Sequence, residues 1–266
     1  MDLELGGKTA IVTGGSRGIG KAIARQLARE GADVAIVARA LEPLQATANE
    51  LAAETGRRIV PITADTGRDE SVKTMVRSAA DALGHLDILV NCAARVAGTT
   101  PEPTLPEITD ESFWGDMNVK VMGYLRCARD VAPYMQRQGW GRIISLSGLA
   151  ARRAGSILAS TRNVAVVALS KNLADELGPF GINVNVVHPG TTRTERTAGM
   201  IAARAEREGV SLEEAERRLA QGSTVRRIID ATEIAYVVAF LASPKSIAIN
   251  GEVIAVGGGL PGAIYY

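Results

Sequence analysis

The stretch that decides the fold is Thr9-Ala-Ile-Val-Thr13-Gly-Gly-Ser-Arg-Gly-Ile-Gly20. Its first half is apolar and β-branched, which predicts a buried strand, and its glycines open directly into an amphipathic helical segment. Glycines let the backbone turn sharply and approach a pyrophosphate, while the amides at a helix N-terminus donate to that anion. Because this loop stands between a strand and a helix at the start of an alternating chain, it predicts dinucleotide binding.

The remainder of the chain alternates short β-branched runs with longer amphipathic segments, as parallel sheets built from βαβ units do. We therefore expect an α/β protein with a doubly wound parallel sheet, the Rossmann fold, in a single domain over residues 1–266. Helices are predicted at 18–30, 41–54, 69–83, 110–138, 160–177 and 232–241. Strands are predicted at 9–13, 33–38, 58–63, 87–91, 141–147, 183–187 and 252–256.

Two stretches interrupt this alternation. Residues 96–109 are rich in Pro and Thr and are predicted to form a loop. Residues 195–227 are strongly charged and apolar only at intervals. Such a segment, placed after a strand end, is typical of a mobile helical flap over a substrate site. A solvated helical insertion is the alternative.

Composition excludes several classes of function. The net charge is +1 with dispersed basic residues, so we expect no nucleic-acid partner. No apolar run approaches the ~20 residues that span a bilayer, and the start Met1-Asp-Leu-Glu is acidic, unlike a signal peptide. Cys92 and Cys127, the only cysteines, lie in apolar contexts and are predicted to be buried thiols in a cytoplasmic protein. With only two Cys and two His, no metal site is expected.

The TGxxxGxG spacing of the first loop resembles that of the classical short-chain dehydrogenase/reductase family, and further motifs extend the resemblance over nearly the whole chain. Asn91-Cys-Ala-Ala94 stands for the family's Asn-Asn-Ala-Gly. His188-Pro-Gly190, followed by Thr194, matches the residues that hold the nicotinamide amide in the family. The resemblance implies that the cofactor contacts Gly14, Ser16, Arg17, Gly18, Ile19, Gly20, Asp65, Thr66, Asn91, Ala93, Pro189, Gly190, Thr192 and Thr194.

The choice between NAD and NADP follows from charge at the end of the second strand. An NAD enzyme places a carboxylate there to accept from the ribose 2′-hydroxyl. Here the strand ends in Arg39, and the first acid is Glu42. Arg39 and Arg17 would both face a 2′-phosphate, which guanidinium groups bind well. NADP(H) is the predicted cofactor, and two solvated arginines are the alternative.

The family's catalytic Asn-Ser-Tyr-Lys set is not matched here. Counting back from Leu169-Ser-Lys-Asn-Leu places Ala159 at the Tyr position and Asn163 at the Lys position, so the resemblance implies an atypical member lacking the Tyr-x-x-x-Lys pair. Gly148 aligns with the usual Ser, although the spacing also allows Ser147. Successive residues of a strand face opposite sides, so only one of the two can point into the cleft, and we favour Gly148.

The register of the fourth helix places Lys120 at the family's Asn position. A lysine in the cleft would lose hydration and have a lowered pKa, so that it could act as general acid or bind a carbonyl as a Schiff base. The alternative is that Asn118 takes the role through a local bulge and that Lys120 is a surface lysine. The catalytic candidates are thus Lys120, Asn163 and Ser147. Tyr124 is more typical of a core aromatic. Arg152, Arg153 and Arg162 are either anion anchors or surface charges, and the sequence favours neither.

These features predict an NADP(H)-dependent oxidoreductase that acts on a small carbonyl or alcohol substrate with a non-standard acid/base set. The alternatives are a non-redox lyase or isomerase that retains the nucleotide, and a non-catalytic NADP(H)-binding protein. Family tails such as the one after Gly257-Gly-Gly259 reach a neighbouring subunit, so the resemblance also implies a homodimer or homotetramer.

Overall fold

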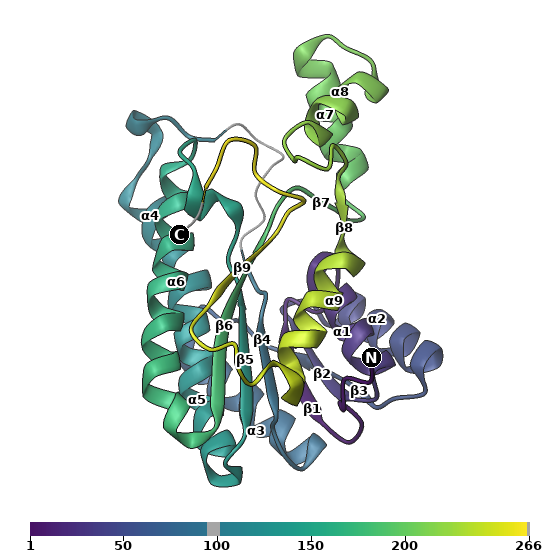
Figure 1. Cartoon of the computed structure of the whole chain (residues 1–266), viewed down its shortest axis with the longest axis vertical. Coiled ribbons are helices and arrows are strands. Elements are labelled where there is room, and N and C mark those ends of the chain that lie inside the picture. The colour runs from purple at the N-terminus through teal and green to yellow at the C-terminus, as the bar shows by residue number, and fades with distance from the viewer. Residues whose placement is uncertain (95–101, 265–266) are drawn as a thin grey trace.

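The computed structural model describes residues 1–94 and 102–264, and its centre is a seven-stranded parallel sheet of order β3-β2-β1-β4-β5-β6-β9 (Figure 1). The chain runs outward from β1 to β3 and then returns to β4 on the other side of β1. This confirms the predicted doubly wound α/β sheet. The strands are β1 (Thr9–Thr13), β2 (Asp33–Ala38), β3 (Ile59–Thr63), β4 (Ile88–Asn91), β5 (Gly141–Leu146), β6 (Ile182–Pro189) and β9 (Val253–Val256).

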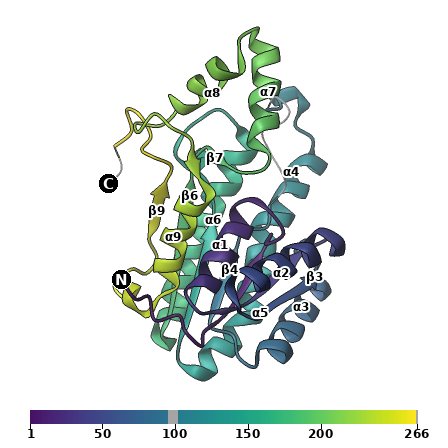
Figure 2. The same ribbon diagram turned by 90° about the vertical axis from the view of Figure 1, so that its right-hand side faces the viewer.

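Helices cover both faces of the sheet (Figure 1, Figure 2). One face packs against α1 (Gly18–Arg29), α2 (Leu41–Thr55) and α9 (Ala231–Ala242). The other packs against α3 (Asp69–Leu83), α5 (Gly123–Gln138) and α6 (Ile157–Leu177). Because β1 and β4 are buried on both sides, their central residues are continuously apolar rather than alternating, whereas the equally buried β5 also contains Arg142 and Ser145.

The single helix predicted over 110–138 is interrupted. It consists of α4 (Asp110–Met117), a π-helical turn at Asn118–Met122, and α5. In that turn the amide of Gly123 donates to the carbonyl of Asn118, five residues earlier. One extra residue per turn rotates the side chains on either side of it relative to a regular helix, and such turns occur mostly at functional sites. Apolar periodicity alone does not reveal a single wide turn of this kind.

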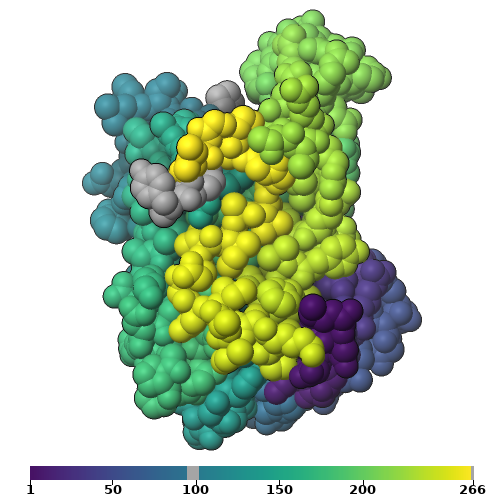
Figure 3. Space-filling model, viewed as in Figure 1, coloured from purple at the N-terminus to yellow at the C-terminus, as the bar shows by residue number. Residues whose placement is uncertain are grey.

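The segment predicted as a flap contains two short helices that project beyond the carboxyl edge of the sheet (Figure 1), and its atoms form the light-green lobe at the top of Figure 3. They are α7 (Thr197–Glu208) and α8 (Leu212–Ala220), set between the short strands β7 (Thr192–Arg193) and β8 (Ile229–Asp230). Ile201, Ala205, Ala215 and Ile228 form a small apolar cluster of their own. The amides of Thr224 and Val225 donate to the carbonyls of Gly259 and Gly258, so the C-terminal segment anchors the end of the flap.

The structure also shows the positions of part of the predicted 96–109 loop and of the two thiols. Residues 96–101 of the predicted 96–109 loop lie outside the described part of the chain, and its remainder, 102–109, contains a 3₁₀ turn at Leu105–Glu107. Cys127 is buried, whereas Cys92 is only half-buried, and neither forms a disulfide. Among residues 1–94 and 102–264, no helix has both the length and the hydropathy needed to cross a bilayer.

The tight glycine loop after β1 can be tested by substitution. A Cβ on Gly20 would lie 2.2 Å from the carbonyl oxygen of Gly14. We therefore expect Gly20→Ala to lower the free energy of unfolding by about 1–3 kcal/mol, measured by urea denaturation. The matched control is Gly199→Ala in α7, where a Cβ meets no atom within 4 Å. That change should stabilise by about 0.5–1 kcal/mol, and equal stability of the two variants would contradict the close contact.

Candidate active site

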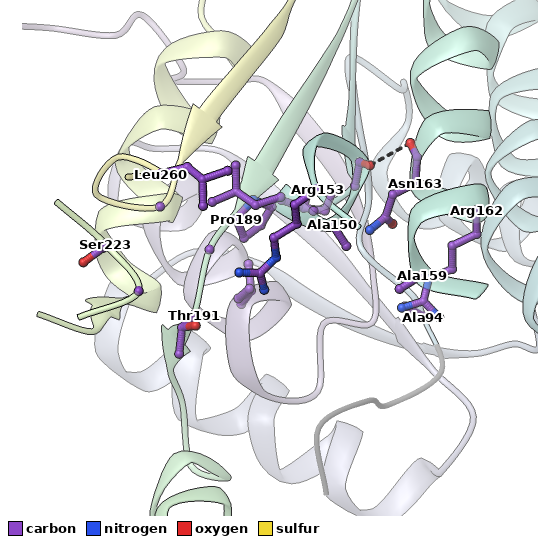
Figure 4. Close-up of a pocket in the computed structure, with 18 of the residues that line it drawn as sticks. Ala94, Ala150, Arg153, Ala159, Arg162, Asn163, Pro189, Thr191, Ser223 and Leu260 are labelled. Carbon is purple, nitrogen blue, oxygen red and sulfur yellow. Dashed lines mark hydrogen bonds between the residues drawn. The ribbon is translucent and has the colours of Figure 1, made fainter. Parts of the chain in front are cut away.

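The carboxyl ends of the central strands open onto a cavity of about 440 Å³ (Figure 4). Its walls come from the ends of β4, β5 and β6, from the first two turns of α6, from the flap, and from the segment after β9. In doubly wound sheets, ligands bind at this edge, beside the point where the strand order reverses. The cavity therefore lies where the sequence predicted cofactor and substrate to meet.

Lys120 supplies a buried amine at this cavity. Its residue is only 5% exposed, and its Nζ donates to the carbonyl of Ser147 at 2.8 Å and to Oδ1 of Asn163 at 2.9 Å. Burial lowers the pKa of Lys120 to about 7, and the positive charge of Arg162 adds to this effect. An ammonium has three N–H donors. Two have protein acceptors, and the third has none among the residues that the structure describes.

Ser147 and Asn163 are joined to one another as well as to Lys120. The Ser147 hydroxyl donates to the backbone carbonyl of Asn163 at 2.9 Å (Figure 4). This hydroxyl is therefore used to connect β5 to α6. A Cβ on Gly148 would lie 2.9 Å from Nδ2 of Asn163, so the Asn163 amide fills the space that a serine side chain at 148 would enter. Both residues lie beyond the end of β5 at Leu146, so strand alternation does not apply to them, and both line the cavity.

His188 and Arg162 form further polar contacts next to this group. The amide of Gly148 donates to Nδ1 of His188 at 3.2 Å, and burial lowers the pKa of His188 to about 4, which keeps the ring neutral. Arg162, on α6, donates from Nη1 to both carboxylate oxygens of Asp116 on α4, at 2.7 and 2.5 Å. Sequence reasoning missed His188 as a structural acceptor and Asp116 as the partner of Arg162, since no spacing rule links residues that meet only across the fold.

The glycine loop has the backbone geometry that a pyrophosphate requires. Gly14 and Gly18 have φ of +70° and +58°, which favour glycine. A Cβ on Gly14 would lie 3.1 Å from the backbone of Ala93. The amide of Gly18 already donates to a carboxylate oxygen of Glu195 at 3.0 Å, which shows that this helix N-terminus accepts an anion.

Further predicted cofactor residues gather along the same edge. Asn91 is buried, and neither atom of its side-chain amide has a hydrogen-bond partner among the described residues, so polar capacity remains at the end of β4. Ile19, Pro189 and Gly190 line the cavity. The other predicted contacts are placed nearby by local hydrogen bonds or strand ends: Ser16, Gly20, Asp65, Thr66, Thr192 and Thr194.

Arg17 and Arg39 lie at the start of α1 and directly after β2, and both are exposed. Their side chains form no hydrogen bond or ion pair with the residues that the structure describes. Both guanidinium groups are therefore open to a ligand on this edge. A 2′-phosphate group fits this charge, and the donor set of the loop and Asn91 fits the remainder of a dinucleotide.

The two alternatives to Lys120 lie elsewhere. Nδ2 of Asn118 donates to the carbonyl of Gly67 at 3.0 Å, and its Oδ1 accepts from Arg126 at 2.8 Å, on the α3 side of the π-helical turn. Tyr124 is 1% exposed, and its hydroxyl donates to the carbonyl of Leu146, so it is a core aromatic. The π-helical turn thus directs Lys120, rather than either of these residues, to the cavity.

Comparisons with known proteins identify relatives of nearly the whole chain. Residues 14–261 match a family model described as Enoyl-(Acyl carrier protein) reductase. The chain is 37% identical to the short-chain reductase protein NovJ of Streptomyces niveus over 95% of this chain and 93% of that protein. It is 32% identical to the 3-oxoacyl-[acyl-carrier-protein] reductase FabG of Staphylococcus epidermidis, over 95% and 98% of the two chains.

Solved structures extend the comparison to the whole fold. The L-sorbose reductase of Gluconobacter frateurii, in complex with NADPH and L-sorbose, superposes with a TM-score of 0.92 and 30% identity. The superposition covers 99% of this chain and 100% of the reductase. By sequence and by fold alike, the chain belongs to the short-chain dehydrogenase/reductase family.

Proposed function

We propose that this protein is an NADP(H)-dependent oxidoreductase that reduces a small carbonyl compound, with Lys120 as the proton donor. The observation that carries the proposal is the buried amine at the cavity, with its pKa lowered to about 7. A general acid works best when its pKa lies near the operating pH. Within one fold family, the reaction depends on side chains of this kind at the carboxyl edge of the sheet and not on the fold itself.

In the proposed reduction, each of several residues of the chain has a separate role. When bound, NADPH supplies the hydride. As the carbonyl carbon gains it, negative charge develops on the substrate oxygen, and the free N–H of the Lys120 ammonium passes its proton to that oxygen. Asn163 and the carbonyl of Ser147 act as positioning residues, because their oxygens hold the ammonium by its other two hydrogens. Ala159 leaves the space above it open to the substrate.

Two observations support the preference for NADP(H): the positive charge near the glycine loop and the end of β2, and the cofactor of a related reductase. Arg17 and Arg39 would bind the 2′-phosphate, while the amides of the loop at Gly14–Gly20 would bind the pyrophosphate. No carboxylate follows β2 before Glu42 to accept from an unphosphorylated ribose. The related L-sorbose reductase was solved with NADPH, which supports the same choice for this chain.

The proposal extends to assembly and to the flap. Trp114, Met122 and Val164 are exposed to 65%, 40% and 50%, on α4, the π-helical turn and α6. A homodimer or homotetramer that covers them would remove these apolar side chains from water. The α7–α8 flap would close over the substrate and exclude water during hydride transfer. A cytoplasmic location fits two unpaired thiols.

Cofactor preference is tested by Arg39→Asp. We expect the unmodified protein to bind NADPH at least about tenfold more tightly than NADH, a difference of about 1.4 kcal/mol, and the variant to lose this preference. The control is Arg77→Asp on the outer side of α3, which changes the net charge equally without facing the loop. Calorimetry that finds tighter binding of NADH to the unmodified protein would refute the choice of NADP(H).

The role of Lys120 is tested by pH and by substitution. Because the ammonium is the donor, kcat/KM for reduction should fall as pH rises through about 7, and alcohol oxidation, which needs the neutral amine, should rise over the same range. Lys120→Met should lower kcat for reduction by about 10²–10⁴-fold and leave NADPH affinity and melting temperature intact. Lys171→Met, on the exposed side of α6, is the control. Full activity of Lys120→Met would show that another group donates the proton.

The contact between Lys120 and Asn163 is tested by exchanging the two residues. Asn163→Lys alone would place a second ammonium against the first, so we expect a loss of about 2–4 kcal/mol of unfolding free energy near neutral pH. The double variant Lys120→Asn with Asn163→Lys retains one amine and one amide and should recover most of that loss. Urea denaturation of both single variants and the double variant gives the coupling energy. A coupling energy near zero would show that the side chains do not meet.

A further inference from the structure

The cavity carries more positive than negative charge. Among the described lining residues, Glu102 is the one acidic residue. The four cationic ones are Lys120, Arg153, Arg162 and Arg227. The Glu102 carboxylate accepts from the hydroxyl of Ser156 at 2.5 Å, and is thereby held at the start of α6. Lining charges of one sign in a cleft attract ligands of the other sign.

Two of the three arginines already have carboxylate partners. Arg162 is paired with Asp116, as described above. Arg227 donates from Nη1 to Glu233 at 2.6 Å, and its Nη2 contacts the same carboxylate. Both guanidinium groups are therefore neutralised and held in place by the protein itself, and neither is the first choice for a ligand anion.

Arg153 differs from both. Within residues 1–94 and 102–264, its guanidinium has neither a hydrogen bond nor an ion pair. Figure 4 shows its side chain extending into the open space of the cavity, where Ala150, Ala159 and Leu260 contribute apolar surface. A planar guanidinium matches the two oxygens of a carboxylate, or two oxygens of a phosphate, through parallel N–H donors.

We propose that the substrate is an anionic carbonyl compound whose carboxylate or phosphate oxygens bind Arg153 while its carbonyl oxygen faces Lys120. This inference rests on the proposed function, because it places the reacting carbonyl at the Lys120 amine. It adds the substrate class: a short oxoacid or a phosphorylated ketone, with the charged group at one end and the carbonyl at the other. Arg153 is exposed, so with a neutral ketone its guanidinium would remain hydrated and would contribute nothing to recognition.

The test compares matched substrates with NADPH. The carboxylate arm uses short 2- and 3-oxocarboxylates against their methyl esters, and the phosphate arm uses dihydroxyacetone phosphate against dihydroxyacetone. We expect the unmodified enzyme to favour the anion by about 10–100-fold in kcat/KM in one arm, mostly through KM, since a hydrogen-bonded charge pair has this effect. The arm that shows the preference identifies the anion.

Variants separate recognition from chemistry. Arg153→Gln should remove the preference for the anion, because it lowers kcat/KM for the anionic compound far more than for its neutral counterpart, and Arg153→Lys should retain part of the preference. The matched control is Arg58→Gln, an exposed arginine just before β3 that alters net charge equally. A preference lost equally in Arg58→Gln would reflect the overall charge and would overturn the assignment to Arg153.

Two results distinguish this inference from the proposed function. If ester and acid, or ketone and phosphate, are reduced equally well and Arg153→Gln changes neither, the anionic substrate class is wrong while the oxidoreductase stands. If no carbonyl compound in either arm is reduced, the proposed function fails. A separate binding experiment then tests whether Arg153 recognises an anion. For that case, calorimetry with propanoate and with inorganic phosphate on the NADP⁺-loaded protein should show binding that Arg153→Gln abolishes, and unchanged binding in the variant would overturn it.

Discussion

A buried amine held by two oxygens from different elements is the constraint on which this site depends. Removing an ammonium from water is costly unless acceptors replace its hydration. Here the carbonyl of Ser147, at the end of β5, and Oδ1 of Asn163, on α6, serve as those acceptors. The third hydrogen has no protein acceptor among the described residues. A group in this state is poised near neutral pH, which is the condition that proton transfer to a substrate oxygen requires.

The π-helical turn between α4 and α5 makes this arrangement possible. The wide turn at Asn118–Met122 directs Asn118 to Gly67 and Arg126 on one side and Lys120 to the cavity on the other. A regular helix would give these two positions a different relative rotation. Gly123 closes the turn against Thr66, where a Cβ would lie only 3.1 Å away. A local departure from α-helical geometry thus selects which polar side chain faces the reaction.

The cofactor half and the acid/base half of the site are joined through the strand ends. The hydroxyl of Thr13 accepts from the amides of Cys92 and Ala93, so the loop after β1 is tied to the end of β4. His188, at the end of β6, accepts from the amide of Gly148 after β5. Members of one fold family differ in chemistry because such side chains change while the scaffold stays. In this chain the scaffold is that of the reductases it resembles, and the proposed proton donor lies in the π-helical turn between α4 and α5.

The sequence by itself determined the doubly wound sheet, the glycine loop and the lack of a carboxylate after β2. These features depend on periodicity and on short spacings, which a one-dimensional pattern records. It also placed Lys120 and Asn163 at exchanged positions, but left Asn118 as a rival. Only the tertiary structure decided between them, because the choice depends on one extra residue in a helical turn and on contacts between residues 27 and 43 positions apart. The pairing of Arg162 with Asp116, which leaves Arg153 as the unpaired guanidinium of the cavity within the described residues, was likewise decided by distant segments meeting at the sheet edge.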